Sequence, residues 1–290
     1  MPNLKDLKIR IESVKSTRKI TKAMQMVAAA KLRKAQETAE SSRRYSEKMS
    51  DVVSNLSASM KGNEVSSTLL RGTGKDQKHL YIVATAERGL CGGFNSSIVK
   101  MAKSTFQKLL KQNKDFKIVT VGKKGREQLE REYGNFFLKH FELIDAGKTT
   151  YEIASGISEY VINQYREEGF DTLTVYFNKF QSVISQVPTD KMLIPAMVNE
   201  GEDRENVTYE YEPEEDEILA ELLPKAITTY IYTALLENAA SEQGARMSAM
   251  DNATRNAGEM IDKLTIQFNR SRQAAITNEL IEIISGAEAL

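Results

Sequence analysis

The sequence of 290 residues is poor in several reactive residue types: it has one cysteine, two histidines and no tryptophan. One cysteine cannot form a disulfide within the chain, which is typical of proteins from a reducing compartment. So few histidines and cysteines also argue against a structural zinc site. No apolar run approaches the ~20 residues that a membrane-spanning helix needs, and the start MPNLKDLKIR lacks the apolar core of a signal peptide. We therefore expect a cytosolic protein, or one attached to a membrane only through partners.

Charge of one sign is not in excess overall, since 40 Lys and Arg balance 40 Asp and Glu, but it is unevenly distributed. Between Lys5 and Lys48 there are thirteen basic and five acidic residues, and between Glu200 and Glu221 eleven acidic residues accompany Arg204 alone. A basic helix can bind nucleic acid, anionic lipid or an acidic protein, or simply present a solvated face. The acidic stretch predicts a linker over residues 199–216.

The N-terminal segment predicts one very long helix over residues 1–60. It has no glycine up to Met60, and small or apolar residues recur in alternating steps of three and four. The seam consists of Leu4, Leu7, Ile11, Val14, Arg18, Thr21, Gln25, Ala28, Leu32, Ala35, Ala39, Val53, Leu56 and Met60, with Arg18, Thr21 and Gln25 as polar interruptions.

Residues 217–290 also have a helical pattern. Pro224 is expected to end a short lead-in helix, and a main helix of about 60 residues then follows. Because a long helix needs a packing partner in water, the two ends of the chain are predicted to form an antiparallel coiled coil.

The middle of the chain, residues 76–198, has a different period. Short β-branched and aromatic runs alternate with helical patterns, which predicts a Rossmann-like α/β domain with a parallel sheet. The predicted strands are HLYIVATA, FKIVTVG, FFLKHFELI and DTLTVYFNKF, followed by hairpin-like strands in SVISQVPTDKMLIPA. The predicted helices are SSIVKMAKSTFQKLLKQ, KKGREQLEREY and TTYEIASGISEYVINQYREE.

A glycine-rich loop, TAERGLCGGFNSS, follows the first predicted strand. Its glycines, Gly89, Gly92 and Gly93, do not have the G-x-G-x-x-G spacing of a dinucleotide site, and RGTGKD does not fit a P-loop. A tight turn is the better interpretation, with Asn95 or Ser96 as the expected helix cap.

Other reactive residues lack supporting partners in the sequence. Cys91 has no evident activating base, and His79 and His140 lie in strand patterns where side chains usually fill the sheet. The sequence therefore predicts no catalytic residue, no cofactor site and no metal site.

The last helical segment carries an apolar stripe made of Ile276, Leu280, Ile283, Ile284 and Ala287. At 100° per residue these side chains fall within about 100° of one another, and Glu279 and Glu282 point away. Since no later segment of the sequence can cover the stripe, another protein is its expected partner.

Four stretches resemble one known family. They are STRKITKAMQMVAAAKLRKAQ, ERGLCGGFN, SEQGARMSAM and ITNELIEIISGAEA, which occur in order from end to end of the chain. Together they resemble the gamma subunits of the rotary F-type ATP synthases. The resemblance implies that the terminal helices form the central rotor shaft. It also implies that the α/β domain is a foot beside the epsilon subunit and the membrane ring of c subunits.

The resemblance further implies a role without chemistry in this chain. A gamma subunit is a non-catalytic part of an enzyme complex and couples proton or sodium flow to ATP synthesis or hydrolysis by rotating between the beta subunits. It is peripheral, at the cytoplasmic face of the bacterial cell membrane, and contacts the membrane only through the c ring. Contacts with the alpha and beta hexamer are implied at Lys19, Lys22, Met24, Arg272, Gln273, Ile276, Thr277, Glu279, Leu280, Ile283 and Ile284.

Two other classes of function are weighed against this one. A dinucleotide-binding enzyme with coiled-coil arms would bind ATP or NAD as an isolated chain. A nucleic-acid-binding coiled coil would show a salt-dependent affinity for DNA. Chloroplast relatives carry an inserted cysteine pair for thiol regulation, and the single Cys91 predicts that this switch is absent. The expected lack of a transit peptide fits a bacterial chain or a processed organellar one, and we favour a bacterial chain.

Overall fold

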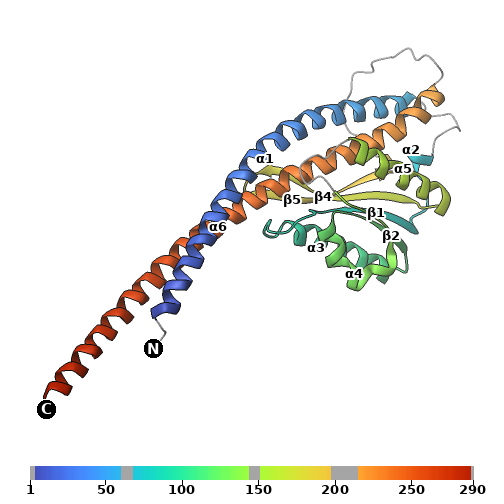
Figure 1. Ribbon diagram of the computed structural model, residues 1–290. Helices are drawn as coiled ribbons and strands as arrows, with labels where there is room; N and C mark the ends of the chain where they lie inside the picture. The colour runs from blue at the N-terminus through green and yellow to red at the C-terminus, as the bar shows by residue number, and fades with distance from the viewer. Residues whose placement is uncertain (1–3, 60–67, 144–150, 197–214, 289–290) are drawn as a thin grey trace. The chain divides into compact units, whose positions relative to one another are not determined.

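The computed structural model describes residues 4–59, 68–143, 151–196 and 215–288 (Figure 1). Its helices are α1 (Leu4–Ser59), α2 (Thr68–Arg71), α3 (Phe94–Lys111), α4 (Lys123–Tyr133), the 3-10 turn η1 (Gly134–Phe136), α5 (Tyr151–Glu168) and α6 (Glu215–Glu288). Its strands are β1 (Lys78–Ala84), β2 (Asp115–Val121), β3 (Phe137–Phe141), β4 (Thr172–Ser182) and β5 (Ser185–Ile194).

The chain forms two compact units. Residues 30–245 make the sheet unit, and residues 1–29 with 246–290 make the helix-end unit. The predicted division into domains at residues 1–60, 76–198 and 217–290 stays a prediction. Most of the predicted acidic linker, residues 199–216, lies outside the described residues.

The sheet has the strand order β3-β2-β1-β4-β5. The first four strands are parallel, with Ile82 of β1 opposite Val119 of β2 and Val175 of β4. β5 is antiparallel to β4, because a two-residue turn joins them and leaves no room for a crossover. The predicted Rossmann-like domain is thus confirmed, but the sheet is mixed rather than wholly parallel.

The two faces of the sheet are covered by different helices (Figure 1). Alternate residues of β1 point to opposite faces. Ile82 packs in a core with α5 and the N-terminal part of α6, whereas Tyr81 packs in a second core with α3 and α4. In the second core, Phe106 and Phe116 stack at 4.8 Å between ring centroids. The N-terminal part of α6 is therefore part of the core of the sheet unit.

In the helix-end unit, α1 and α6 run antiparallel. Thr21 and Thr254 share a hydrogen bond of 2.7 Å between their hydroxyls, and Gln25 donates to Asp251 at 2.9 Å. As the residue number rises along α1, the number of its partner on α6 falls. Burial confirms the predicted seam at Leu7, Ile11, Ala28, Leu32 and Ala39, whereas Arg18 is exposed; the side chain of Leu56 and all of Met60 lie outside what the structure describes.

The prediction that Pro224 ends a lead-in helix was wrong, since α6 continues through it from Glu215 to Glu288. A proline inside a helix costs roughly 3 kcal/mol. The buried side chains of Leu223 and Ile227 on either side contribute about 1.5–3 kcal/mol each only if the helix stays continuous. Packing against the sheet therefore outweighs the local cost.

Candidate partner-binding surfaces

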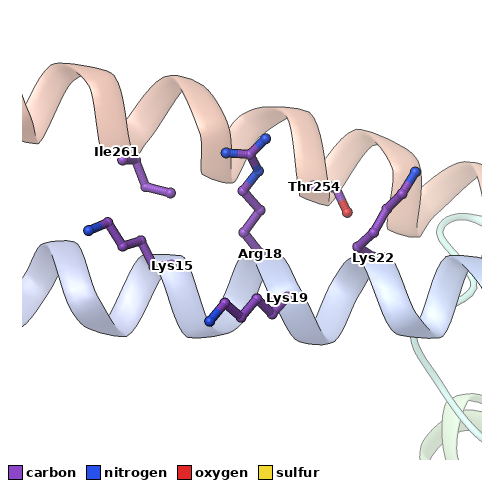
Figure 2. Close-up of a pocket in the computed structure, with 6 residues that line it drawn as sticks. All are labelled: Lys15, Arg18, Lys19, Lys22, Thr254 and Ile261. Atoms are coloured by element: carbon purple, nitrogen blue, oxygen red, sulfur yellow. The ribbon is translucent and has the colours of Figure 1, made fainter.

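A basic groove lies between α1 and α6 in the helix-end unit (Figure 2). It encloses ≈ 650 Å³ and is lined by Lys15, Arg18, Lys19, Lys22, Thr254 and Ile261. Figure 2 shows Arg18 reaching toward α6, with Lys15 and Lys22 to either side. A Cβ atom on Gly258 would lie 4.0 Å from the guanidinium carbon of Arg18, an ordinary van der Waals separation, so the Arg18 side chain lies beside this turn of α6.

The cations of the basic groove are only partly neutralised within their own helix. Lys15 forms an exposed ion pair with Glu12 at 2.9 Å, and Lys22 donates to the neutral Gln25 at 3.0 Å. The hydrogen bond from Lys15, with its charge and that of Lys19, lowers the pKa of Glu12 below its usual value. One carboxylate beside four cations leaves a surface suited to an acidic partner.

Of the three predicted contact residues of α1, Lys19 and Lys22 line this groove and Met24 does not. Lys19 and Lys22 are exposed, whereas Met24 is half-buried. Sequence reasoning missed a second feature of the same helix: Ile9, Ile20 and Val27 are 55–60% exposed. Their separations of eleven and seven residues put them on one face of a helix, so a helical projection could have revealed this stripe.

The C-terminal end of α6 is exposed along its whole circumference. The predicted stripe residues Ile276, Leu280, Ile283 and Ile284 are 49–67% exposed, and Ile281, which was not predicted, is 55% exposed. We call these five residues the apolar end. The predicted polar contacts are exposed beside it: Arg272, Gln273, Thr277 and Glu279.

The apolar end is uncovered because α1 is too short to reach it. Leu4 lies seventeen residues before Thr21, so in the antiparallel pair it faces α6 about seventeen residues after Thr254, near Ser271. α6 continues to Glu288, a further ~25 Å of helix at 1.5 Å per residue. Exposed apolar side chains on this scale mark an interaction site.

The glycine-rich loop after β1 is filled by the chain's own side chains. Asn95 was expected to cap α3, but the helix begins at Phe94 without a side-chain cap. Asn95 instead accepts a hydrogen bond from the Ala86 amide at 2.9 Å and donates to the sulfur of the buried Cys91 at 3.2 Å. Its place inside the first turn directs the side chain back to the loop rather than to the free helix amides.

The start of α4 is also occupied from within the chain. The Glu87 carboxylate accepts hydrogen bonds from the Lys123 and Leu143 amides, both at 3.2 Å. Amides at such a helix start would otherwise suit a phosphate. This arrangement gives no support to the dinucleotide-binding alternative.

The two histidines lie in strands, as predicted. His79 contacts the Thr172 hydroxyl at 2.9 Å, and His140 contacts that of Thr120 at 2.9 Å. Over the ranges that the structure describes, no three His, Cys, Asp or Glu side chains gather as metal ligands. Within the same ranges, none of the helices has the length and apolar character needed to span a bilayer.

Known proteins are similar to this chain over its full length. A family model described as ATP synthase matches residues 3–290. The ATP synthase gamma chain of Jannaschia sp. is 60% identical over 296 residues, and that of Paracoccus denitrificans is 59% identical over 290 residues. Each of these matches covers 100% of both chains.

Solved structures share the fold. A chain from the central stalk and c-ring structure of the Tetrahymena thermophila mitochondrial ATP synthase is 27% identical with a TM-score of 0.61, covering 81% of this chain and 99% of its own length. A chain of the Euglena gracilis mitochondrial ATP synthase in rotational state 3 has a TM-score of 0.69 at 18% identity. The match covers 99% of this chain and 94% of the Euglena chain.

A Rossmann-like sheet between two long terminal helices in the sequence is the architecture that this protein shares with an ATP synthase central-stalk chain. At the level of sequence, the chain belongs to the ATP synthase gamma chain family.

Proposed function

We propose that this chain is the rotor of the central stalk in a bacterial F-type ATP synthase. It transmits torque between an ion-driven c ring in the membrane and a catalytic hexamer of alpha and beta subunits. The chemistry takes place in the hexamer, and this chain supplies no catalytic group. The observation that carries the proposal is the apolar end of α6, an uncovered apolar surface on a chain related over its full length to gamma chains.

The apolar end is suited to a sleeve in which a shaft turns. Hydrophobic attraction is non-directional, so an apolar helix can rotate against an apolar ring without breaking specific bonds. Ile276, Leu280, Ile283 and Ile284 would supply this contact. The polar side chains of Arg272, Gln273, Thr277 and Glu279 would form directional contacts with beta-subunit loops, since hydrogen bonds to charged groups depend on orientation.

The basic groove is suited to acidic loops of the beta subunits, with Lys19, Lys22 and Met24 as contacts. Because basic side chains line one side of the helix pair, each beta subunit would meet a different surface as the shaft turns. A difference in contact is what shifts a conformational equilibrium. Moving a beta subunit from 1:99 to 99:1 open to closed needs about 5.5 kcal/mol of differential affinity. Several modest contacts can supply this.

The names of the related assemblies include the c ring, and the family resemblance adds the epsilon subunit. The epsilon subunit and the c ring would bind the sheet unit, and the chain would be peripheral at the cytoplasmic face of the membrane, held there by the c ring.

The test is reconstitution with purified alpha and beta subunits from the same bacterium. The chain alone should hydrolyse no ATP. The three subunits together should hydrolyse ATP and rotate a bead fixed to the sheet unit. ATP turnover by the chain alone, or an active hexamer whose bead never turns, would contradict the proposal.

A further inference from the structure

The strand β4 continues past the end of its neighbour β1. Their last pair is Val83 with Tyr176, and β4 runs on to Ser182. Backbone groups of every second residue point to the same edge of a strand. Asn178 and Phe180 therefore direct their backbone groups to the side where β1 has ended. Left open, this edge would hold buried, unpaired backbone groups, which are costly.

Three side chains of α6 take the place of the missing strand. The Asn238 side-chain oxygen accepts a hydrogen bond from the Asn178 amide at 3.1 Å, and the Ser241 hydroxyl donates to the Asn178 carbonyl at 2.9 Å. The Glu237 carboxylate accepts from the Phe180 amide at 2.9 Å. All three α6 residues are at most 3% exposed. These hydrogen bonds thus form a buried junction between α6 and β4 inside the sheet unit.

α1 joins the same junction through a charged pair. Arg43 donates from its Nε to Glu237 at 2.9 Å, and one of its terminal nitrogens donates to the same carboxylate oxygen. On the far side, the Asn178 side chain donates to the Phe94 carbonyl of α3 at 3.1 Å. One connected network therefore links α1, α6, β4 and α3.

The kind of bond matters for a part that carries torque. Apolar packing between α6 and the sheet is strong in sum but has no preferred direction. Hydrogen bonds, above all those to a charged group, fix orientation as well as distance. A helix held by both is fixed against turning about its own axis relative to the sheet.

We propose that Arg43, Glu237, Asn238 and Ser241 form a torsional clamp on the β4 edge, through which rotation of the sheet unit turns α6 without slip. This inference rests on the proposed rotor function and names the residues that carry its torque. Glu237, Asn238 and Ser241 lie on the same continuous helix as the apolar end, and Arg43 holds that helix from α1.

The experiment uses the complete ATP synthase carrying variants of this chain. Two quantities are measured: the ions pumped per ATP hydrolysed in inverted membrane vesicles, and the torsional stiffness from angular fluctuations of a bead on stalled complexes. Glu237→Gln keeps an acceptor for Phe180 but removes the charge. Because charge-assisted hydrogen bonds are about twice as strong as neutral ones, the stiffness should fall about twofold.

A charge-partner comparison sharpens the test. Arg43→Met leaves a buried carboxylate without its partner, so it should lower stiffness and pumping more than Glu237→Gln does. Adding Glu237→Gln to Arg43→Met should then restore part of both, although the same change is harmful in the wild type. Ser241→Ala is a milder change, which removes the hydrogen bond to the Asn178 carbonyl. It replaces Arg43→Met in this test if complexes with Arg43→Met do not assemble.

The matched control is Glu221→Gln, which removes an exposed charge that pairs with Lys225 on the same helix. It should leave stiffness and pumping unchanged. If assembled complexes with Glu237→Gln and Ser241→Ala keep wild-type stiffness and pumping and lose only thermal stability, the clamp is overturned and the rotor function stands. A wild-type complex that hydrolyses ATP without turning its sheet unit would instead overturn the rotor function, and the clamp with it.

Discussion

The two ends of α6 share one helical backbone but have opposite environments. In the sheet unit, Leu223, Ile227 and Ile231 are at most 2% exposed, whereas in the helix-end unit Ile276 and Ile283 are 49% and 67% exposed. Residue type does not explain the contrast, because leucine and isoleucine occur at both ends. What differs is whether this chain supplies the covering surface. The sheet unit completes its own core, and the helix-end unit leaves apolar side chains for another protein.

The largest effect is expected where the core is complete. Phe106→Ala removes a fully buried ring from the aromatic cluster of the sheet unit and should lower the free energy of unfolding by about 3–5 kcal/mol. Equilibrium urea unfolding of the purified chain measures this. Leu110→Ala on the same helix is the control, since Leu110 is 46% exposed and should cost far less. Equal losses from both would break the distinction between covered and uncovered side chains.

The next effect depends on whether the partners are present. Ile283→Asp should leave the stability of the isolated chain nearly unchanged, because Ile283 is 67% exposed. In the complex it should impair assembly, since a buried unpaired charge costs several kcal/mol. Ile283→Val should be mild, at ~1 kcal/mol or less. Binding of each variant to the alpha and beta hexamer is the measurement, and wild-type binding by Ile283→Asp would show that this residue does not face a sleeve.

Smaller effects should separate localised from diffuse polar contacts. The single change Arg272→Ala should already weaken coupling, because a charge-assisted hydrogen bond contributes about 1.5–3 kcal/mol. A single Lys19→Ala or Lys22→Ala removes an exposed charge worth ~0–1 kcal/mol and should barely alter rotation. Replacing Lys15 and Arg33 as well should weaken hexamer binding.

Ionic strength provides the check on that contrast. The loss from the combined lysine and arginine changes should be larger at low salt, because salt screens exposed charges beyond about 8–10 Å. ATP-driven rotation and coupled synthesis are measured across salt concentrations. A Lys19→Ala variant that abolished coupling beside a harmless Arg272→Ala would reverse the assignment.

The smallest effect concerns pH and the sheet unit alone. Burial of His79 lowers its pKa below the ordinary value of 6.5, although the nearby Asp76 opposes the shift. Protonation then favours the unfolded chain, so stability is full above pH 6.5 and falls as the pH drops below it. His79→Gln should remove this part of the acid sensitivity. Urea unfolding between pH 5 and 8 measures this change in slope. A His140→Gln variant, which replaces the other strand histidine, is measured for comparison. An unchanged slope in His79→Gln would contradict the attribution.

Periodicity predicted most of the fold. The helix predicted over residues 123–133 agrees in both bounds with α4, because Gly122 and Gly134 flank an uninterrupted helical pattern. The α1 seam and the strands of the sheet were predicted for the same reason: their signal is local. The short α2 helix was missed, since four residues are too few to show a period.

The features that were missed depend on contacts distant in sequence. Pro224 is tolerated because core side chains on both sides of it pack against the sheet, and the basic groove forms only where α1 meets Thr254 and Ile261 of α6. Asn178 and Glu237 are ordinary polar residues in the sequence, and their role follows only from the place where β1 ends. A local pattern contains none of this information.

The paired hydroxyls of Thr21 and Thr254, with the neighbouring hydrogen bond from Gln25 to Asp251, fix the axial register of α1 against α6. If one helix slid along the other by one heptad, or ~10 Å, Asp251 would lose the amide of Gln25, and Thr254 would face Val14 or Ala28 instead of Thr21. Apolar contacts tolerate such sliding much better, because one aliphatic neighbour can replace another. Two polar layers, which contribute little attraction, therefore set how far α6 projects past the first turn of α1.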